Sequence, residues 1–250
     1  MKYKIEKNTV QETLIIPLYA RKVCSELYPN LYRDETAVRL IDEIDYDFSE
    51  AEKNSRGLMQ RFGSLEVAMR QNDLAFEVRD YLKSHPNAAV VNLGCGLDST
   101  GRSCDNGSCK IYNLDFPDVI AVRNELLPAG EREKNISCDL NDTAWFSEID
   151  ASGGAVFFAS GVFYYFLTEQ VKALVQGMAD AFPGSVLVFD AANRTAVKMI
   201  AKTWLKSAKI KDVGAYFAVS DAKSELSPWD SRLQVTSRGY ICLLYTSPSP

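Results

Sequence analysis

The stretch that most constrains this chain's fold covers residues 88–98, AAVVNLGCGLD. Its first four residues are apolar and follow a turn-forming His-Pro-Asn sequence, which is typical of a strand buried on both faces of a parallel sheet. Gly94 and Gly96 then allow a tight turn and leave no side chain between the backbone N–H groups and a ligand. The pattern predicts a nucleoside-containing cofactor at the end of this strand.

Asp115 ends the next apolar run and stands 19 residues after Gly96. A carboxylate about 20 residues beyond a glycine loop accepts hydrogen bonds from ribose hydroxyls in nucleotide-binding folds. The third glycine of the dinucleotide pattern is missing, because Ser99 occupies its position. S-adenosylmethionine has no pyrophosphate to bind, so the loop favours a methyltransferase over a nicotinamide oxidoreductase. A glycine turn without a ligand is the third interpretation.

Composition narrows the class of protein. The chain has 250 residues, 46% hydrophobic and 24% charged, which suits a globular α/β core with an added helical cap. Its 28 basic and 33 acidic residues give a net charge of -5, so the broad positive field of non-specific nucleic-acid binding is absent. No apolar run reaches the roughly 20 residues of a membrane span, and no signal-peptide pattern opens the chain. We therefore expect a cytoplasmic protein that binds neither nucleic acid nor a membrane.

Six cysteines are scattered along the chain rather than concentrated in a small scaffold, which predicts reduced thiols. Cys104 and Cys109 flank an Asn-Gly turn that could bring them together as a disulfide or as half of a metal site. The chain has no matching CxxC pair, and its single histidine, His85, precedes the first strand. The sequence therefore predicts no metal site.

The order of apolar patterns predicts the fold class. Three helices are expected between Thr9 and Lys83, the third starting at Ser64, and five strands then alternate with helices up to residue 190. This alternation predicts an α/β fold, with a Rossmann-like, mostly parallel sheet and helices on both faces. We expect an N-terminal helical cap over residues 1–84 and a cofactor-binding core over residues 85–240.

In such a sheet the ligand lies beyond the carboxyl ends of the strands. Five polar residues fall at or just after these ends and are candidates for contact with ligand: Asp98, Asp115, Asp139, Ser160 and Asp190. His85 falls at the opposite edge, which indicates a loop residue rather than a general base. Tyr164, Tyr165 and Asp190 are the catalytic candidates, with packing of the core or rim as the alternative for each.

Two motifs resemble a known family. Residues 90–98 (VVNLGCGLD) and 114–123 (LDFPDVIAVR) are similar to the leucine carboxyl methyltransferases and polyketide O-methyltransferase-like enzymes. The similarity extends from about Thr13 to Tyr240. Members of that family are class I S-adenosylmethionine-dependent methyltransferases with an N-terminal helical cap. The resemblance implies these cofactor contacts: Gly94 and Gly96 at the methionine part, Asp115 at the ribose, Asp139 and Leu140 beside the adenine, and Arg70 at the cofactor carboxylate.

The sequence departs from the family pattern in two places. Ser160 stands where the leucine carboxyl methyltransferases carry an acidic residue, which favours a small-molecule acceptor over a protein phosphatase. Residues 241–250 do not resemble the family, so we expect a truncated chain with an incomplete C-terminal strand pair. The runs 213–219 and 233–236 are the remaining β-favouring segments. One edge of the sheet should therefore lack its usual partner.

The expected activity is in-line transfer of a methyl group to a small-molecule carboxylate or hydroxyl. Such a displacement needs no covalent enzyme intermediate, so the protein chiefly binds and aligns the reactants and excludes water. Two alternatives remain open from the sequence. One is a homologue that binds the cofactor without turnover, and the other is an NAD(P)-dependent oxidoreductase.

Overall fold

The computed structural model describes residues 2–5, 10–49, 51–52, 57–200 and 216–239. Within these residues five strands form one parallel sheet in the order β5-β4-β3-β6-β7. The strands are β3 (Ala89–Leu93), β4 (Lys110–Asp115), β5 (Glu133–Ser137), β6 (Ala155–Ala159) and β7 (Val186–Phe189). The chain order reverses beside β3, which makes the carboxyl end of β3 the switch point where such sheets bind ligands. The predicted fold class is confirmed.

The register of the sheet lines up the predicted site residues. Leu93 at the end of β3 lies opposite Leu114 of β4 and Ala159 of β6. The residues that follow these three positions are Gly94, Asp115 and Ser160. Because the strands are parallel, the three residues leave the sheet at the same edge.

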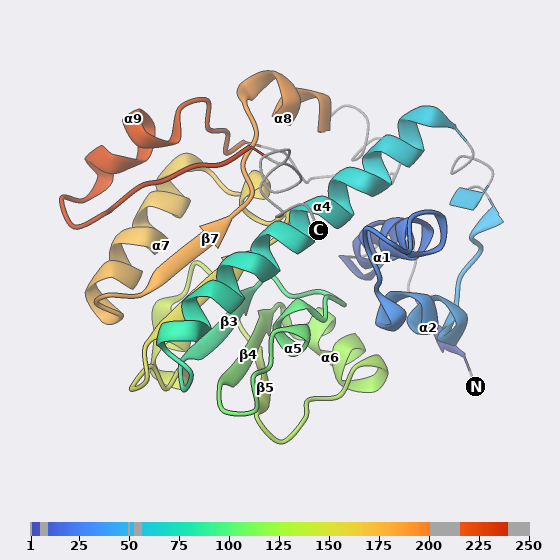
Figure 1. The fold of residues 1–250 in the computed structure, drawn as a ribbon, viewed down its shortest axis with the longest axis horizontal. Coiled ribbons are helices and arrows are strands. Elements are labelled where there is room, and N and C mark those ends of the chain that lie inside the picture. The colour runs from blue at the N-terminus through green and yellow to red at the C-terminus, as the bar shows by residue number, and fades with distance from the viewer. Residues whose placement is uncertain (1, 6–9, 50, 53–56, 201–215, 240–250) are drawn as a thin grey trace.

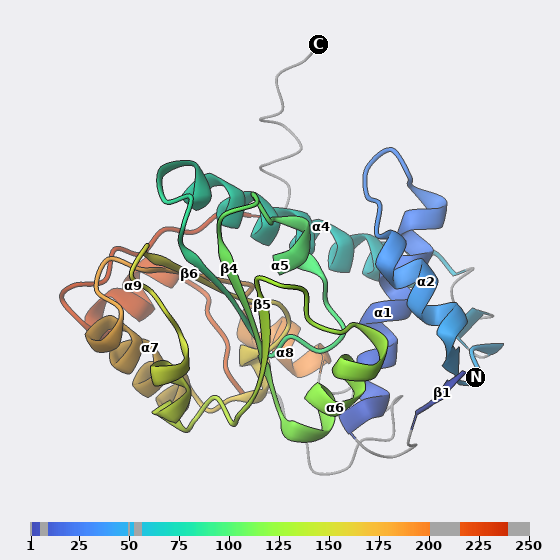
Figure 2. The same cartoon turned by 90° about the horizontal axis from the view of Figure 1, so that it is seen from below.

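Helices cover both faces of the sheet, as Figures 1 and 2 show. The long helix α4 (Leu58–Ser84) packs on one face, and α7 (Thr168–Ala181) packs on the other together with η1 (Thr143–Glu148). Every residue of β3 and β6 is buried, which explains why β6 is an unbroken apolar run and why β3 is apolar except for Asn92. Helix α6 (Pro117–Leu126) begins with proline at a position where its missing N–H is harmless.

The N-terminal helices α1 (Val10–Leu27) and α2 (Glu35–Glu43) lie beside the carboxyl end of the sheet. Asp34 caps α2 by accepting a 2.8 Å hydrogen bond from the Ala37 amide. Leu18 and Leu40 are fully buried in a cluster with Leu97 of the glycine loop and with α6. The short strands β1 (Tyr3–Lys4) and β2 (Ile44–Asp45) pair beside this cluster. The apolar faces of the cap helices are therefore buried against the core.

The structure corrects two expectations about secondary structure. Helix α4 begins at Leu58 rather than at Ser64, because Gly63 lies inside the helix instead of preceding it. Residues 216–219 and 233–236 are irregular rather than β, and residues 213–215 lie outside the described part. The Tyr216 amide donates to the Tyr164 carbonyl at 2.7 Å, and the Val219 amide to the Ala192 carbonyl at 2.9 Å. These bonds join the segment to loops rather than to β7.

Three elements follow β7: α8 (Arg194–Ile200), α9 (Ala222–Leu226) and η4 (Ser227–Trp229). Two short helices lie earlier in the chain, α5 (Thr100–Ser103) after the glycine loop and η2 (Phe163–Tyr165) after β6. Residues 241–250, predicted to be a tail unlike the family, lie outside the described part of the chain. Among the helices that the structure describes, none combines the length and apolarity needed to span a bilayer.

Candidate active site

The glycine loop after β3 adopts a backbone that other residues rarely reach. Gly94 has φ of +66° and Gly96 has φ of +46°. A Cβ atom at Gly94 would lie 2.6 Å from a methyl carbon of Val162, and one at Gly96 would lie 3.1 Å from a methyl carbon of Leu14. Both the backbone conformation and the surrounding atoms therefore require glycine here.

Asp115 is bonded directly to this loop. One carboxylate oxygen accepts from the Gly96 amide at 2.8 Å and the other from the Phe116 amide at 2.8 Å. Burial raises the pKa of Asp115, whereas the two amide bonds and the positive charge of Arg123 lower it. A carboxylate has about four acceptor positions, so further donors such as two ribose hydroxyls can still bind.

Arg123 of α6 supports the loop from below and is 1% exposed. Its Nη1 atom donates to the Gly96 and Asp98 carbonyls, each at 2.8 Å, and its Nε atom donates to the Asn135 side chain at 3.2 Å. The sequence analysis predicts no role for this arginine. Arg123 lies between Ile120 and Leu127 at helical spacing, and an arginine on an otherwise apolar helix face indicates a buried side chain.

Asp98 is buried, and the protein itself provides its hydrogen-bond donors. One carboxylate oxygen accepts from the Thr100 amide at 2.9 Å, from the Thr100 hydroxyl at 2.7 Å and from the Gln71 side-chain amide. The other oxygen accepts from the Asn92 side-chain amide at 3.1 Å. This geometry places Asp98 below the loop, in contact with α4 and β3.

A second buried carboxylate, Asp190, binds two other predicted site residues, Arg70 and Tyr164. Asp190, which follows β7, accepts from the Gly161 amide at 2.6 Å, from the Tyr164 hydroxyl at 2.8 Å and from Arg70 Nη1 at 3.1 Å. Gly161 has φ of +70°, and a Cβ atom there would lie 3.2 Å from the Arg70 guanidinium. Gly161 was not predicted as a site residue. Its left-handed backbone directs its amide to Asp190.

The other predicted site residues differ in how deeply they are buried. Tyr164 is buried, whereas Tyr165 is 43% exposed. Ser160 is half-buried directly after β6. Asp139 is exposed and accepts from the Asn141 backbone and side-chain amides, each at 2.9 Å, whereas Leu140 is buried. His85 is an exposed residue at the C-terminus of α4, far along that helix from Arg70.

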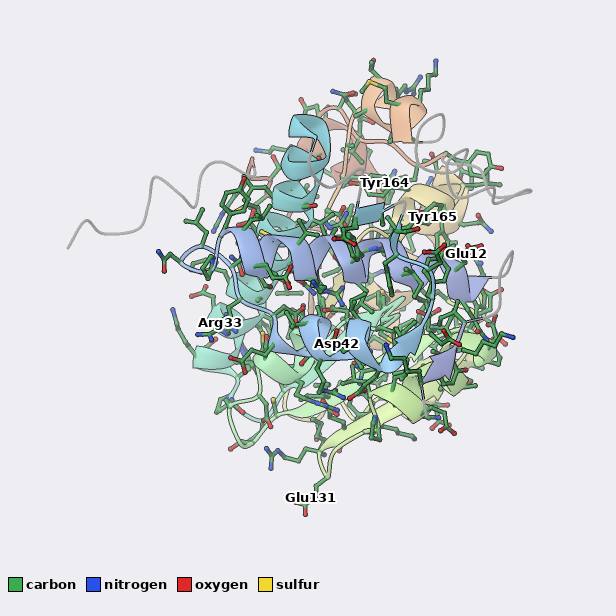
Figure 3. All side chains as sticks on the ribbon, turned by 90° about the vertical axis from the view of Figure 1, so that its right-hand side faces the viewer. Glu12, Arg33, Asp42, Glu131, Tyr164 and Tyr165 are labelled. Atoms are coloured by element: carbon green, nitrogen blue, oxygen red, sulfur yellow. The ribbon has the colours of Figure 1, made fainter. Side chains whose placement is uncertain are left out.

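Two open grooves lie away from these residues. A groove of about 570 Å³ is lined by Phe146, Ser152 and Phe182 at the amino end of the sheet. A second groove of about 550 Å³ lies on the cap, between Arg33 and Asp42, which Figure 3 labels on the outer side of α2. Neither groove includes a predicted site residue. The convergence of carboxylates, glycines and Arg70 at the switch point is therefore a better guide to the site than groove size.

Comparison with known proteins places this geometry in a family. The family model described as leucine carboxyl methyltransferase matches residues 16–179, which include the glycine loop, Asp115 and Arg70. The chain belongs to this family. The resemblance expected from residues 90–98 and 114–123 is thereby confirmed.

Two relatives are similar to this chain in sequence. The tetracenomycin polyketide synthesis O-methyltransferase TcmP of Streptomyces glaucescens is 27% identical over 183 residues, covering 73% of this chain and 66% of that protein. The S-adenosyl-L-methionine-dependent methyltransferase dpfgK of Gibberella zeae is 26% identical over 196 residues, covering 74% of this chain and 65% of that protein. The matched stretch thus spans just under two thirds of each relative.

A solved structure shows the same fold. A protein from Thermobifida fusca, assigned as a methyltransferase, superposes with a TM-score of 0.50 at 20% sequence identity, covering 78% of this chain and 75% of that chain. At this identity the likeness concerns the fold alone. It supports the parallel sheet with helices on both faces as the scaffold of a family member.

Proposed function

We propose that this chain is an S-adenosylmethionine-dependent O-methyltransferase that acts on a small-molecule carboxylate or hydroxyl. The observation that carries the proposal is the bond between Asp115 and the Gly96 amide, which makes the ribose acceptor and the glycine loop one rigid unit. The two relatives support the class, since one is named an O-methyltransferase of polyketide synthesis and the other an S-adenosyl-L-methionine-dependent methyltransferase.

The residues of the loop fit this cofactor. A side chain at Gly94 or Gly96 would collide with Val162 or Leu14. Because both residues are glycine, no side chain of the loop itself would separate its backbone from a ligand. Asp115 would accept the ribose hydroxyls, and Leu140 with Asp139 would lie beside the adenine. When bound, S-adenosylmethionine would supply a methyl carbon on a sulfonium: the acceptor's lone pair would bond to this carbon in line as the carbon–sulfur bond breaks and the thioether S-adenosylhomocysteine leaves. This chain's part is then to hold both reactants in line and to exclude water.

Arg70 is the candidate for the cofactor carboxylate. Asp190 accepts from Arg70 Nη1 at 3.1 Å and thereby fixes the direction of the guanidinium, and the Arg70 side chain is 18% exposed. A guanidinium carries five N–H donors in a planar fork, which allows one carboxylate to orient it while another is bound. Ser160 stands at the same edge, between the glycine loop and Asp190 in the order of the strands.

The catalytic candidates favour an acceptor that is already nucleophilic. Both oxygens of Asp190 accept hydrogen bonds from the protein, and the Tyr164 hydroxyl donates to one of them. These groups therefore support the site rather than stand ready to remove a proton. A carboxylate acceptor needs no general base, whereas a hydroxyl acceptor gains from one. Tyr165, exposed at the rim, is the remaining candidate for contact with the acceptor.

The proposal is tested by methyl transfer from labelled S-adenosylmethionine to a panel of small carboxylic acids and phenols. We expect label in at least one acid or phenol and none in RNA, DNA or a protein mixture, because the net charge of -5 does not favour nucleic acid. Tight cofactor binding with no transfer to any member of a broad metabolite extract would instead support the homologue without turnover.

A further inference from the structure

Two consecutive residues of α4 bind the two buried carboxylates of the site. Arg70 contacts Asp190 after β7, and Gln71 contacts Asp98 in the glycine loop. Helix α4 thus reaches both sides of the switch point with one dipeptide. Gln71 is 7% exposed, and neither the glycine pattern nor the family motifs single it out.

Gln71 also binds the cap. The Tyr32 hydroxyl donates to the Gln71 side-chain carbonyl, and the Gln71 amide nitrogen donates to Asp98. Burial raises the pKa of Tyr32, so its hydroxyl keeps the proton that it donates. The result is a relay of hydrogen bonds from the cap through α4 to the glycine loop. Because Asp98 can only accept, the Gln71 amide nitrogen faces it and the Gln71 carbonyl faces Tyr32.

A second contact runs beside this relay. Arg21 of α1 donates from Nη2 to the Leu97 carbonyl at 2.9 Å and pairs through Nε with Asp34 at 3.0 Å. The Asp34 carboxylate lies 3.2 Å from the Tyr32 hydroxyl. The cap is thereby bonded to residues 97 and 98 of the loop through buried polar groups, Arg21 to the Leu97 carbonyl and Tyr32 through Gln71 to Asp98.

We propose that Gln71 is a positioning residue that holds the glycine loop in its cofactor-binding conformation by joining Asp98 to Tyr32. The inference rests on the proposed function only in assuming that this loop binds S-adenosylmethionine. Asp98 then acts through the loop rather than on the cofactor, because it is buried and its carboxylate already accepts four hydrogen bonds, two from Thr100 and one each from Asn92 and Gln71.

The test compares the same glutamine-to-leucine substitution at Gln71 and at a control position, Gln176. Gln71→Leu removes the relay, whereas Gln176→Leu removes a single hydrogen bond from α7 to the Trp229 carbonyl, far from the loop. We expect Gln71→Leu to weaken S-adenosylmethionine binding about tenfold, the effect of one hydrogen bond to a charged group, and Gln176→Leu to leave it unchanged. Equal affinities of the wild type and both variants would overturn the proposal.

Hydrogen exchange of the protein without cofactor provides a readout that a merely stabilising residue would not change. In Gln71→Leu we expect faster exchange at residues 94–100, with α7 still protected as in the wild type. Exchange that rises evenly over the whole chain, or not at all in the loop, would contradict a positioning role. Because this measurement needs no ligand, it stands even if the wild type binds no S-adenosylmethionine, in which case only the proposed function fails.

Tyr32→Phe is the second variant, since it keeps the ring and removes only the hydroxyl. It should shift loop exchange and cofactor affinity in the same direction as Gln71→Leu, by a smaller factor, because Gln71 keeps its bond to Asp98. Asp98→Asn separates the two roles of the carboxylate. Weaker binding with unchanged loop exchange in Asp98→Asn would make Asp98 a direct cofactor ligand and overturn the proposal.

Discussion

Gly94 and Gly107 have similar backbones in different surroundings. Both have positive φ, but a Cβ atom would meet Val162 at Gly94 and nothing within 4 Å at Gly107. Gly94→Ala should lower the free energy of unfolding by roughly 1–3 kcal/mol through backbone strain. Overpacking against Val162 should lower it by about 1–3 kcal/mol more. Gly107→Ala should show the first loss only. Urea denaturation measures both, and equal losses would show that Val162 moves aside freely.

Arg123 is the buried cation on which the loop rests. Arg123→Met fills much of the same volume but leaves the Gly96 and Asp98 carbonyls without this donor. We expect a loss of about 3 kcal/mol in the free energy of unfolding, since hydrogen bonds to charged groups contribute roughly 1.5–3 kcal/mol each. Arg39→Met, which removes an exposed arginine paired with the exposed Glu43, should lose less than about 1 kcal/mol. Similar losses in the two variants would argue against a special role for Arg123.

Sequence spacing predicts residues that the backbone itself brings together. Gly94, Gly96 and Asp115 follow adjacent strands, so a strand pattern is enough to place them at one edge. The partners of Asp98 and Asp190 on α4 lie 27 and 120 residues away in the chain. Nothing in a single sequence indicates such pairs, because they depend on how α4 crosses the sheet.

Among the elements, α4 carries an acid that makes stability depend on pH. Burial and the neighbouring Glu77 raise the pKa of Asp73 to about 6, against the opposing effect of Arg238. The folded protein therefore holds this proton more tightly than the unfolded chain, in which the pKa of an aspartate is about 3.9. The contribution of Asp73 to stability is greatest below about pH 4 and is lost as the pH rises through about 6.

Asp73→Asn tests this dependence. The variant should be more stable than the wild type at pH 7, and the difference should shrink as the pH falls from about 6 to about 4. Urea midpoints across this range give the comparison, with Asp80→Asn as an exposed control on the same helix. A difference that does not change with pH would mean that Asp73 titrates alike in the folded and unfolded states.

The elements that the sequence predicted well are those whose burial leaves a simple pattern. Strands β3 and β6 are buried along their length, and the proline at the start of α6 marks its first turn. The predicted start of α4 was wrong, because glycine and serine also occur inside helices that tertiary packing stabilises. Residues 216–219 are β-favouring, yet the loop contacts of Tyr216 and the burial of Phe217 outweigh that preference.

At the scale of the whole molecule, the cap, α4 and the sheet meet at the glycine loop. Leu14 of α1 and Val162 of the loop after β6 both lie against its glycines, while Arg123 supports it from α6. A ligand that binds this place contacts several elements at once and should stabilise all of them. The free energy of unfolding increases with the ligand concentration, by about 2.7 kcal/mol when that concentration is 100 times the dissociation constant.

The measurement that tests the central claim most directly is calorimetric titration of the wild type and of Asp115→Asn with S-adenosylmethionine. We expect one site per wild-type chain and at least about tenfold weaker binding by the variant, because an amide offers one oxygen where the carboxylate offers two to the loop amides and the ribose. No binding by the wild type, or equal affinity of the two proteins, would contradict the assignment of this loop as the cofactor site.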